Sequence, residues 1–202
     1  MELLGVFPIP VGMTTLNRDF TDAEKECFDK ISKKTYNNYG NLTSDEKNVL
    51  NLPGLENLKK FCIESVELFV KSYNPPKHFL SFYITQSWIN YTSKNQNHHS
   101  HYHPNSFISG VLYLNADINN DKIYFVNPND TPMLKYTSES FTIFNSDHWF
   151  MPVETLKLVL FPSSLKHFVD VNQQPYQRIS LSFNTFIKGM LGEEFNLTEL
   201  VL

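Results

Sequence analysis

Cysteine is scarce in this chain: Cys27 and Cys62 are the only two among 202 residues, and they lie far apart. Two thiols cannot build a disulfide framework. The absence of a Cys-x-x-Cys pair also excludes the common zinc-ribbon and thioredoxin-like redox motifs. We therefore expect both cysteines to be reduced, buried packing residues.

Long apolar runs are also missing, and none approaches the roughly 20 residues of a membrane-spanning helix. The first eight residues lack the basic segment and apolar stretch of a secretion signal. The net charge of -4 argues against a broad electrostatic grip on nucleic acid. We expect a soluble, cytoplasmic protein without a membrane or nucleic-acid partner.

Hydrophobic residues make up 41% of the chain and charged residues 19%, which is enough apolar material for a sizeable core. Disorder is therefore excluded as the main state. The length suits one compact domain. We expect an N-terminal strand and helices over residues 1–76 that pack on a β-rich core over residues 77–188.

Helix signals occur in the first third of the chain. Thr21 and Glu24 form a capping box, which predicts a helix that ends near Tyr36. A second helix start at Ser44 is stopped early by Pro53. The clearest signal covers residues 54–73, where apolar side chains recur at steps of three and four, as expected for a packing face.

The remaining pattern consists of short β-rich runs separated by Asn, Asp, Pro and Ser clusters. An interrupted edge strand is predicted over residues 1–16. Strands that follow one another without intervening helices favour an antiparallel sandwich or barrel, with the helices on one outer face. The predicted runs after the helices are residues 79–91, 107–114, 122–125, 140–144, 156–161 and 178–186.

Histidines are concentrated in one segment, at positions 98, 99, 101 and 103. Residues two apart on an extended strand point to the same side, so His101 and His103 can aim two imidazoles at one point, and so can His99 and His101. His167 follows an apolar run and a turn. A third ligand from such a remote strand would complete a facial triad with open metal positions.

Arg178 is the first residue of a run in which apolar and polar residues alternate. Its place in this alternation predicts that its side chain faces inward. Its planar guanidinium can pair bidentately with a carboxylate. His167, at the start of one strand, and Arg178, inside the next, could therefore face one cavity. The alternative is an arginine on the surface of an edge strand.

Four segments, taken in order, resemble a family of 2-oxoglutarate/iron(II) oxygenases found in bacteria and bacteriophages. The segments are His-x-His-Pro at 101–104, Ser-Gly-Val-Leu-Tyr-Leu at 109–114, the run 160–167 that ends at His167, and Arg-Ile-Ser-Leu-Ser-Phe-Asn at 178–184. Residues 7–11 and 86–90 also fit the family pattern, so the resemblance spans most of the chain.

The resemblance implies a double-stranded β-helix, a jelly roll with helices on one face. It implies that iron(II) is held by His101 and His103 from one strand and by His167 from another. It further implies that 2-oxoglutarate is bound by Arg178 at its distal carboxylate, with Ser180, Tyr113 and Asn90 as further co-substrate residues.

Position 103 departs from the wider superfamily, which has Asp or Glu where this chain has His103. Three neutral imidazoles leave a divalent metal with its full charge. Three histidines plus an open position also occur in catalytic zinc sites. The identity of the metal therefore stays open.

The function that we predict is an Fe(II)- and 2-oxoglutarate-dependent oxygenase that uses O2 to hydroxylate an unidentified substrate, releasing succinate and CO2. One alternative is a three-histidine dioxygenase or zinc hydrolase that does not use 2-oxoglutarate. A second alternative is a non-catalytic binding module with the inherited fold. Exposed sheet edges are compatible with a homodimer.

Several aromatic residues could line a substrate mouth, although large aromatics more often pack in a core. The candidates are Trp88, Tyr91, Trp149 and Phe150. We expect His98 and His99 to be solvated loop residues. The substrate class stays open among protein side chains, peptides, nucleobases and small metabolites.

Overall fold

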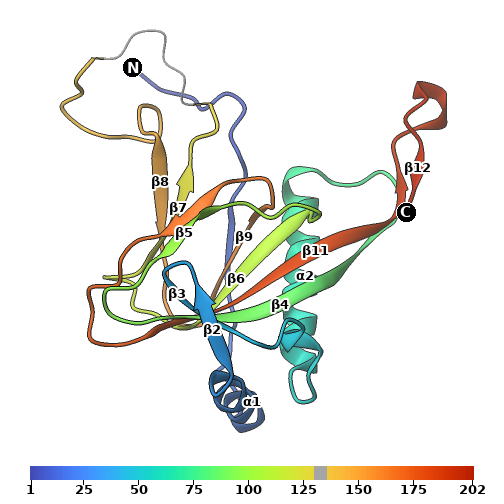
Figure 1. Cartoon of the computed structure of the whole chain (residues 1–202). Coiled ribbons are helices and arrows are strands. Elements are labelled where there is room, and N and C mark those ends of the chain that lie inside the picture. The colour runs from blue at the N-terminus through green and yellow to red at the C-terminus, as the bar shows by residue number, and fades with distance from the viewer. Residues whose placement is uncertain (130–135) are drawn as a thin grey trace.

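The computed structural model describes residues 1–129 and 136–202, which form two antiparallel β-sheets with two α-helices outside them (Figure 1). The larger sheet has eight strands: β1 (Gly12–Thr15), β9 (Lys157–Pro162), β6 (Ile108–Asn115), β11 (Arg178–Leu191), β4 (Leu80–Thr92), β3 (Asn41–Ser44) and β2 (Thr35–Asn38) in that order, with β12 (Leu200–Val201) on β11. The smaller sheet contains β5 (His98–His101), β10 (His167–Val169), β7 (Lys122–Val126) and β8 (His148–Pro152).

The larger sheet is covered on one face by α2 (Glu56–Tyr73), which Figure 1 shows crossing β4 and β11 at an angle. Ile89 of β4 and Leu181 of β11 join Leu58 and Val66 of α2 in one buried apolar cluster. Successive strand residues point to opposite faces. The burial of these residues therefore turns their neighbours toward the smaller sheet.

The space between the two sheets contains a second apolar cluster. Val111 and Tyr113 of β6 meet Ile123 and Phe125 of β7 there, together with Phe161 of β9. Two facing antiparallel sheets with helices on one outer side are the predicted jelly roll, a double-stranded β-helix. The predicted fold class is confirmed.

The first helix, α1 (Asp22–Ser32), begins with the predicted capping box. The Thr21 hydroxyl accepts from the Glu24 backbone at 3.2 Å, and the Glu24 carboxylate accepts from the Thr21 backbone at 2.8 Å. The predicted end near Tyr36 is wrong. The chain leaves the helix after Ser32 because residues 35–38 pair with β3 as a strand.

The predicted helix start at Ser44 is also wrong. Ser44 ends β3, and its hydroxyl accepts a hydrogen bond from the Ile89 backbone at 3.0 Å. A single 3-10 turn, η1 (Val49–Asn51), follows before Pro53. A second turn of this type, η2 (Glu194–Asn196), precedes β12. The longest predicted helix is confirmed as α2.

One predicted strand is wrong and the others are confirmed. Residues 140–144 are not a strand, because the Thr142 backbone donates to the Asn145 side chain at 2.7 Å and closes a turn. The strand of this region, β8, begins only at His148. The other predicted runs coincide with β4, β6, β7, β9 and β11 to within a few residues.

The N-terminal part of the chain contributes strands as well as helices. Strand β1 lies at the edge of the larger sheet, as predicted, and pairs only with β9 along the sheet order. Strands β2 and β3 extend the opposite edge. The division of the chain at residues 76 and 77 stays a prediction.

Both cysteines are free, but their burial differs. Cys62 is fully buried in α2, as expected, whereas Cys27 is only half-buried. Within the described ranges, no helix combines the length and apolarity that crossing a membrane requires.

Gly110 is a point of close contact in the larger sheet, where it pairs with Phe183 across β6 and β11. A Cβ at Gly110 would lie 2.2 Å from Cζ of Phe183. We expect Gly110→Ala to lower the free energy of unfolding by about 1–3 kcal/mol through overpacking, as measured by urea denaturation. Gly5→Ala is the control, because its Cβ meets nothing within 4 Å. Coincident unfolding curves for the two variants would contradict this.

Candidate metal centre

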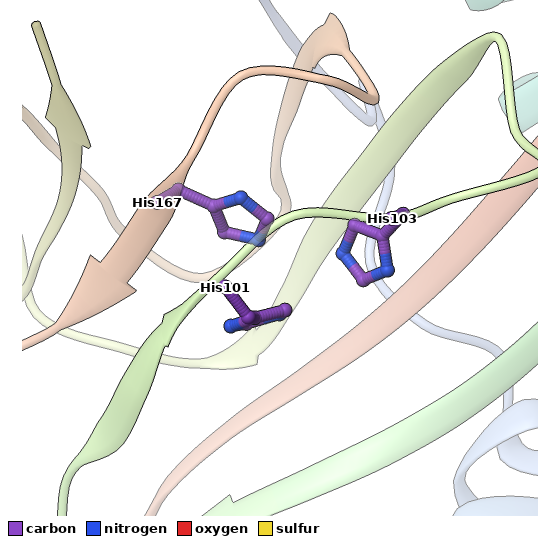
Figure 2. A group of neighbouring side chains, drawn as sticks. All are labelled: His101, His103 and His167. Atoms are coloured by element: carbon purple, nitrogen blue, oxygen red, sulfur yellow. The ribbon is translucent and has the colours of Figure 1, made fainter. Parts of the chain in front are cut away.

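Three histidines from two segments far apart in the sequence converge between the two sheets. His101 ends β5 and pairs directly with His167, the first residue of β10. One ring nitrogen of each of His101, His103 and His167 lies within 4.8 Å of the other two. Figure 2 shows the three rings arranged around a common point.

His103 lies outside the strand that carries His101, so the expectation that both ligands come from one strand is wrong. Strand β10 has only three residues and offers no ladder partner beyond His101. The backbone of His103 instead donates to the Ser163 carbonyl at 2.9 Å. Pro104, which has no N–H, follows at once.

Backbone carbonyls orient two of the imidazoles. Nδ1 of His101 donates to the carbonyl of His99 at 2.8 Å, and Nδ1 of His167 donates to the carbonyl of Leu165 at 3.1 Å. Each of these bonds leaves Nε2 unprotonated and available to a metal. His103 rests against Trp88, with ring centroids 5.6 Å apart.

Burial keeps these imidazoles neutral. Desolvation lowers the pKa of His103 to about 4, and the neighbouring His101 adds to the effect. Desolvation likewise lowers the pKa of His101, and that of His167 falls well below its usual value. A metal binds the neutral form of histidine, so the site is in a ligand-ready state at neutral pH.

The three imidazole nitrogens suit a divalent transition metal that is intermediate between hard and soft. Imidazole nitrogen suits iron, zinc, copper and nickel, and three ligands on one side leave positions open for other molecules. The group of three contains no carboxylate. A bound divalent ion would therefore keep its full charge.

The residues predicted to bind a co-substrate line the same inner cavity as the three histidines. Asn90 comes from β4, Tyr113 from β6, and Arg178 and Ser180 from β11. The cavity volume is about 20 Å³, which is space for a single water molecule. A larger ligand therefore requires some lining side chains to move.

Two polar atoms of this cavity have no hydrogen-bond partner in the described part of the chain: the hydroxyl of Tyr113 and the amide oxygen of Asn90. The Asn90 amide nitrogen does have one, since it donates to the Ser182 hydroxyl at 3.2 Å. Buried polar atoms rarely lack a partner. Their presence here is consistent with a polar ligand.

Arg178 is 5% exposed and already holds two acceptors. It donates to the carboxylate of Asp121 at 3.1 Å and to the backbone carbonyl of Asp170 at 3.3 Å. The hydroxyl of Tyr176 donates to the other oxygen of Asp121 at 2.8 Å. The sequence interpretation missed Asp121, which lies 57 positions from Arg178 and carries no local pattern.

An outer cavity of about 450 Å³ lies against two of these histidines, His101 and His103. Trp88, His98, His101 and His103 line both cavities and so form the wall between them. Polar side chains line the rest of the outer cavity, among them Asn38, Thr43, Lys47, Gln86 and Asn184.

His98 and His99 are not the solvated loop residues that we expected. Both belong to β5 and are half-buried. The ring of His98 stacks on His101 with centroids 4.6 Å apart, and burial lowers the pKa of His98 to about 3.

The aromatic residues predicted to line a substrate mouth have different positions. Trp88 lines both cavities. Tyr91 is buried in the cluster beneath α2. Trp149 and Phe150 stack on each other in β8, with centroids 5.6 Å apart.

Residues 86–184 match the sequence profile of a family described as "Putative 2OG-Fe(II) oxygenase". This span carries the three histidines and the four predicted co-substrate residues. No curated protein sequence matches the chain significantly.

Solved structures with this fold include several 2OG-Fe(II) oxygenases. An oxidoreductase of that family from Burkholderia pseudomallei has a TM-score of 0.56 and 15% identity, over 87% of this chain and 83% of its own. A prolyl-4-hydroxylase from Pseudomonas putida has a TM-score of 0.55 and 12% identity, over 87% and 92%. HygX from Streptomyces hygroscopicus, with nickel, 2-oxoglutarate and hygromycin B bound, has a TM-score of 0.55 and 11% identity, over 87% and 82%. At identities this low, the structural likeness shows that the fold is shared and no more.

The buried histidines predict how stability depends on pH. The pKa of His103 is about 4 in the folded protein, against about 6.5 in an unfolded chain. Between these values the unfolded state binds more protons, so stability falls as the pH is lowered from about 6.5 toward 4. We expect the Tm of the metal-free protein to fall over this window, and less steeply in His103→Gln. His148→Gln, at an exposed position in β8, is the control. Parallel profiles for wild type and His103→Gln would contradict the assignment.

Proposed function

We propose that this chain is a 2-oxoglutarate- and Fe(II)-dependent oxygenase that hydroxylates an unidentified substrate. One observation carries the proposal: three neutral histidines and an inward-facing arginine line a single buried cavity. The family match over the same residues supports it.

In this proposal His101, His103 and His167 hold the metal. A bound iron(II) ion supplies oxygen activation, coupled to oxidation of 2-oxoglutarate to succinate and CO2. The protein supplies the ligand geometry. The carbonyls of His99 and Leu165 keep the Nε2 atoms of His101 and His167 turned toward the metal.

Arg178 binds the distal carboxylate of 2-oxoglutarate. A guanidinium has five N–H groups, and two of those on Arg178 have protein acceptors. The others have no acceptor among the described residues and remain for the ligand. The Tyr113 hydroxyl, which has no partner within residues 1–129 and 136–202, lies in the same cavity as Ser180, and both donate to that carboxylate as well.

The substrate approaches from the outer cavity, which has room for a group the size of one sugar or amino-acid residue. Because the inner cavity is small, 2-oxoglutarate requires the wall of Trp88 and His98 to shift. The wall then separates the co-substrate from bulk water, which strengthens the charge interactions behind it.

A second candidate is a three-histidine metalloenzyme that does not use 2-oxoglutarate. The absence of a carboxylate from the histidine group favours it, because three histidines and an open position are also a catalytic zinc arrangement. In such an enzyme the metal lowers the pKa of a bound water. Arg178 would then have no co-substrate to bind.

Anaerobic titration with iron(II) and then 2-oxoglutarate tests the metal assignment. We expect a metal-to-ligand charge-transfer band in the wild-type protein and none in His167→Ala, which lacks one of the three ligands. Arg178→Ala should weaken 2-oxoglutarate binding by at least about tenfold, since it removes a charged partner of the distal carboxylate. His148→Ala is the control. Tight metal binding without the band would favour the second candidate, and no metal binding would refute both.

Tyr113→Phe tests the co-substrate pocket separately. The Tyr113 hydroxyl is buried and unpartnered in the described structure, so its removal should maintain or raise the Tm of the ligand-free protein. It should also weaken 2-oxoglutarate binding by about tenfold, because a hydrogen bond to a charged group is lost. A lower Tm with unchanged binding would show that the hydroxyl has a structural role instead.

A further inference from the structure

Asp121 is a buried carboxylate that the proposed reaction does not use. It immediately precedes β7 and is 2% exposed. Three donors hold it: the guanidinium of Arg178 at 3.1 Å, the hydroxyl of Tyr176 at 2.8 Å and the backbone N–H of Asp117 at 2.9 Å. These three bonds fix its position in the ligand-free protein.

The partner of this carboxylate, Arg178, would be costly to bury alone. A charge removed from water is strongly unfavourable unless an opposite charge lies beside it, and removing one partner of a buried pair is strongly destabilising. Both side chains are almost inaccessible. Asp121 thus neutralises Arg178 in the ligand-free protein.

The same carboxylate affects any second anion that approaches Arg178. If the proposed function holds, the distal carboxylate of 2-oxoglutarate shares one guanidinium with Asp121. Two carboxylates near one cation repel each other, and the repulsion is largest where water is excluded.

We infer that Asp121 is the resident counter-ion of Arg178, which stabilises the empty cavity and limits how tightly a dicarboxylic keto acid binds. Asp121 acts through Arg178 and the local potential, without touching the co-substrate. This inference rests on the proposed function.

The charges of the whole site agree with this role. A divalent ion on three neutral imidazoles, a doubly negative keto acid and the Arg178–Asp121 pair together carry no net charge. Loss of the Asp121 charge would leave one positive charge, which favours the anionic ligand and disfavours the ligand-free fold. Groups that limit binding in this way often stabilise the protein.

Asp121→Asn tests the inference, because it removes the charge and keeps the shape of the side chain. Dissociation constants are measured by calorimetry on the Mn(II)-loaded protein for two keto acids. One is 2-oxoglutarate and the other is 2-oxopentanoate, which has the same chain length but lacks the distal carboxylate. The Tm of the ligand-free protein is measured in parallel.

We expect Asp121→Asn to bind 2-oxoglutarate about tenfold more tightly, in keeping with the removal of one nearby repulsive charge. Binding of 2-oxopentanoate should stay unchanged, and the ligand-free Tm should fall by several degrees. Tyr176→Phe is the matched control: it removes one hydrogen bond to Asp121 but retains the charge, so its affinity for 2-oxoglutarate should remain close to that of wild type.

Two results would overturn the inference: weaker or unchanged 2-oxoglutarate binding in Asp121→Asn, or equal changes for both keto acids. Failure of the wild-type protein to bind either keto acid would instead refute the proposed function. If Asp121→Asn does not fold, Arg178→Gln is added to it. The double variant has no unpaired charge and should regain the fold, and its failure to do so would also overturn the inference.

Discussion

Strands β4, β6 and β11 bury alternate side chains beneath α2. This burial turns the intervening side chains of the same strands toward the smaller sheet. Ile89, Leu112 and Leu181 lie in the helix-side cluster, where each contributes roughly 1.5–3 kcal/mol by leaving water. Asn90, Tyr113 and Ser180 are therefore turned into the inner cavity. A register slip of one residue would exchange the two sets, so the apolar face determines where the polar site forms.

The candidate metal centre depends on a much shorter stretch of strand pairing than the larger sheet does. Strands β5 and β10 pair over a few residues, with His101 opposite His167. The backbone of His103 is fixed by Ser163 in the turn between β9 and β10. Because both contacts involve the segment 162–167, one turn aligns His101 and His103 with His167. The low pKa of His103 follows from this packing, since desolvation is its main cause.

Local patterns predicted the larger elements well and the short ones poorly. The stripe of α2 and the apolar runs of β6 and β9 each contain enough periodic residues to specify one structure. Lys33 and Lys34 after Ser32 are good helix formers, yet the chain turns into β2 because residues 35–38 find a backbone partner in β3. Residues 140–144 have strand-like composition, but the side-chain hydrogen bonds of Thr142 and Asn145 favour a turn. In both places a local preference is weaker than a specific hydrogen bond.

The sequence by itself indicated an antiparallel β-rich fold, and its resemblance to a family implied the jelly-roll class. It also singled out His101, His103 and His167, and the alternation along one strand predicted the inward direction of Arg178. Tertiary structure alone decided three further features: that His103 leaves its strand, that His98 packs against His101, and that Asp121 neutralises Arg178. Desolvation and ion pairing depend on distances between remote segments. Asp121 and Arg178 are 57 positions apart, and only the folded sheets bring them to 3.1 Å.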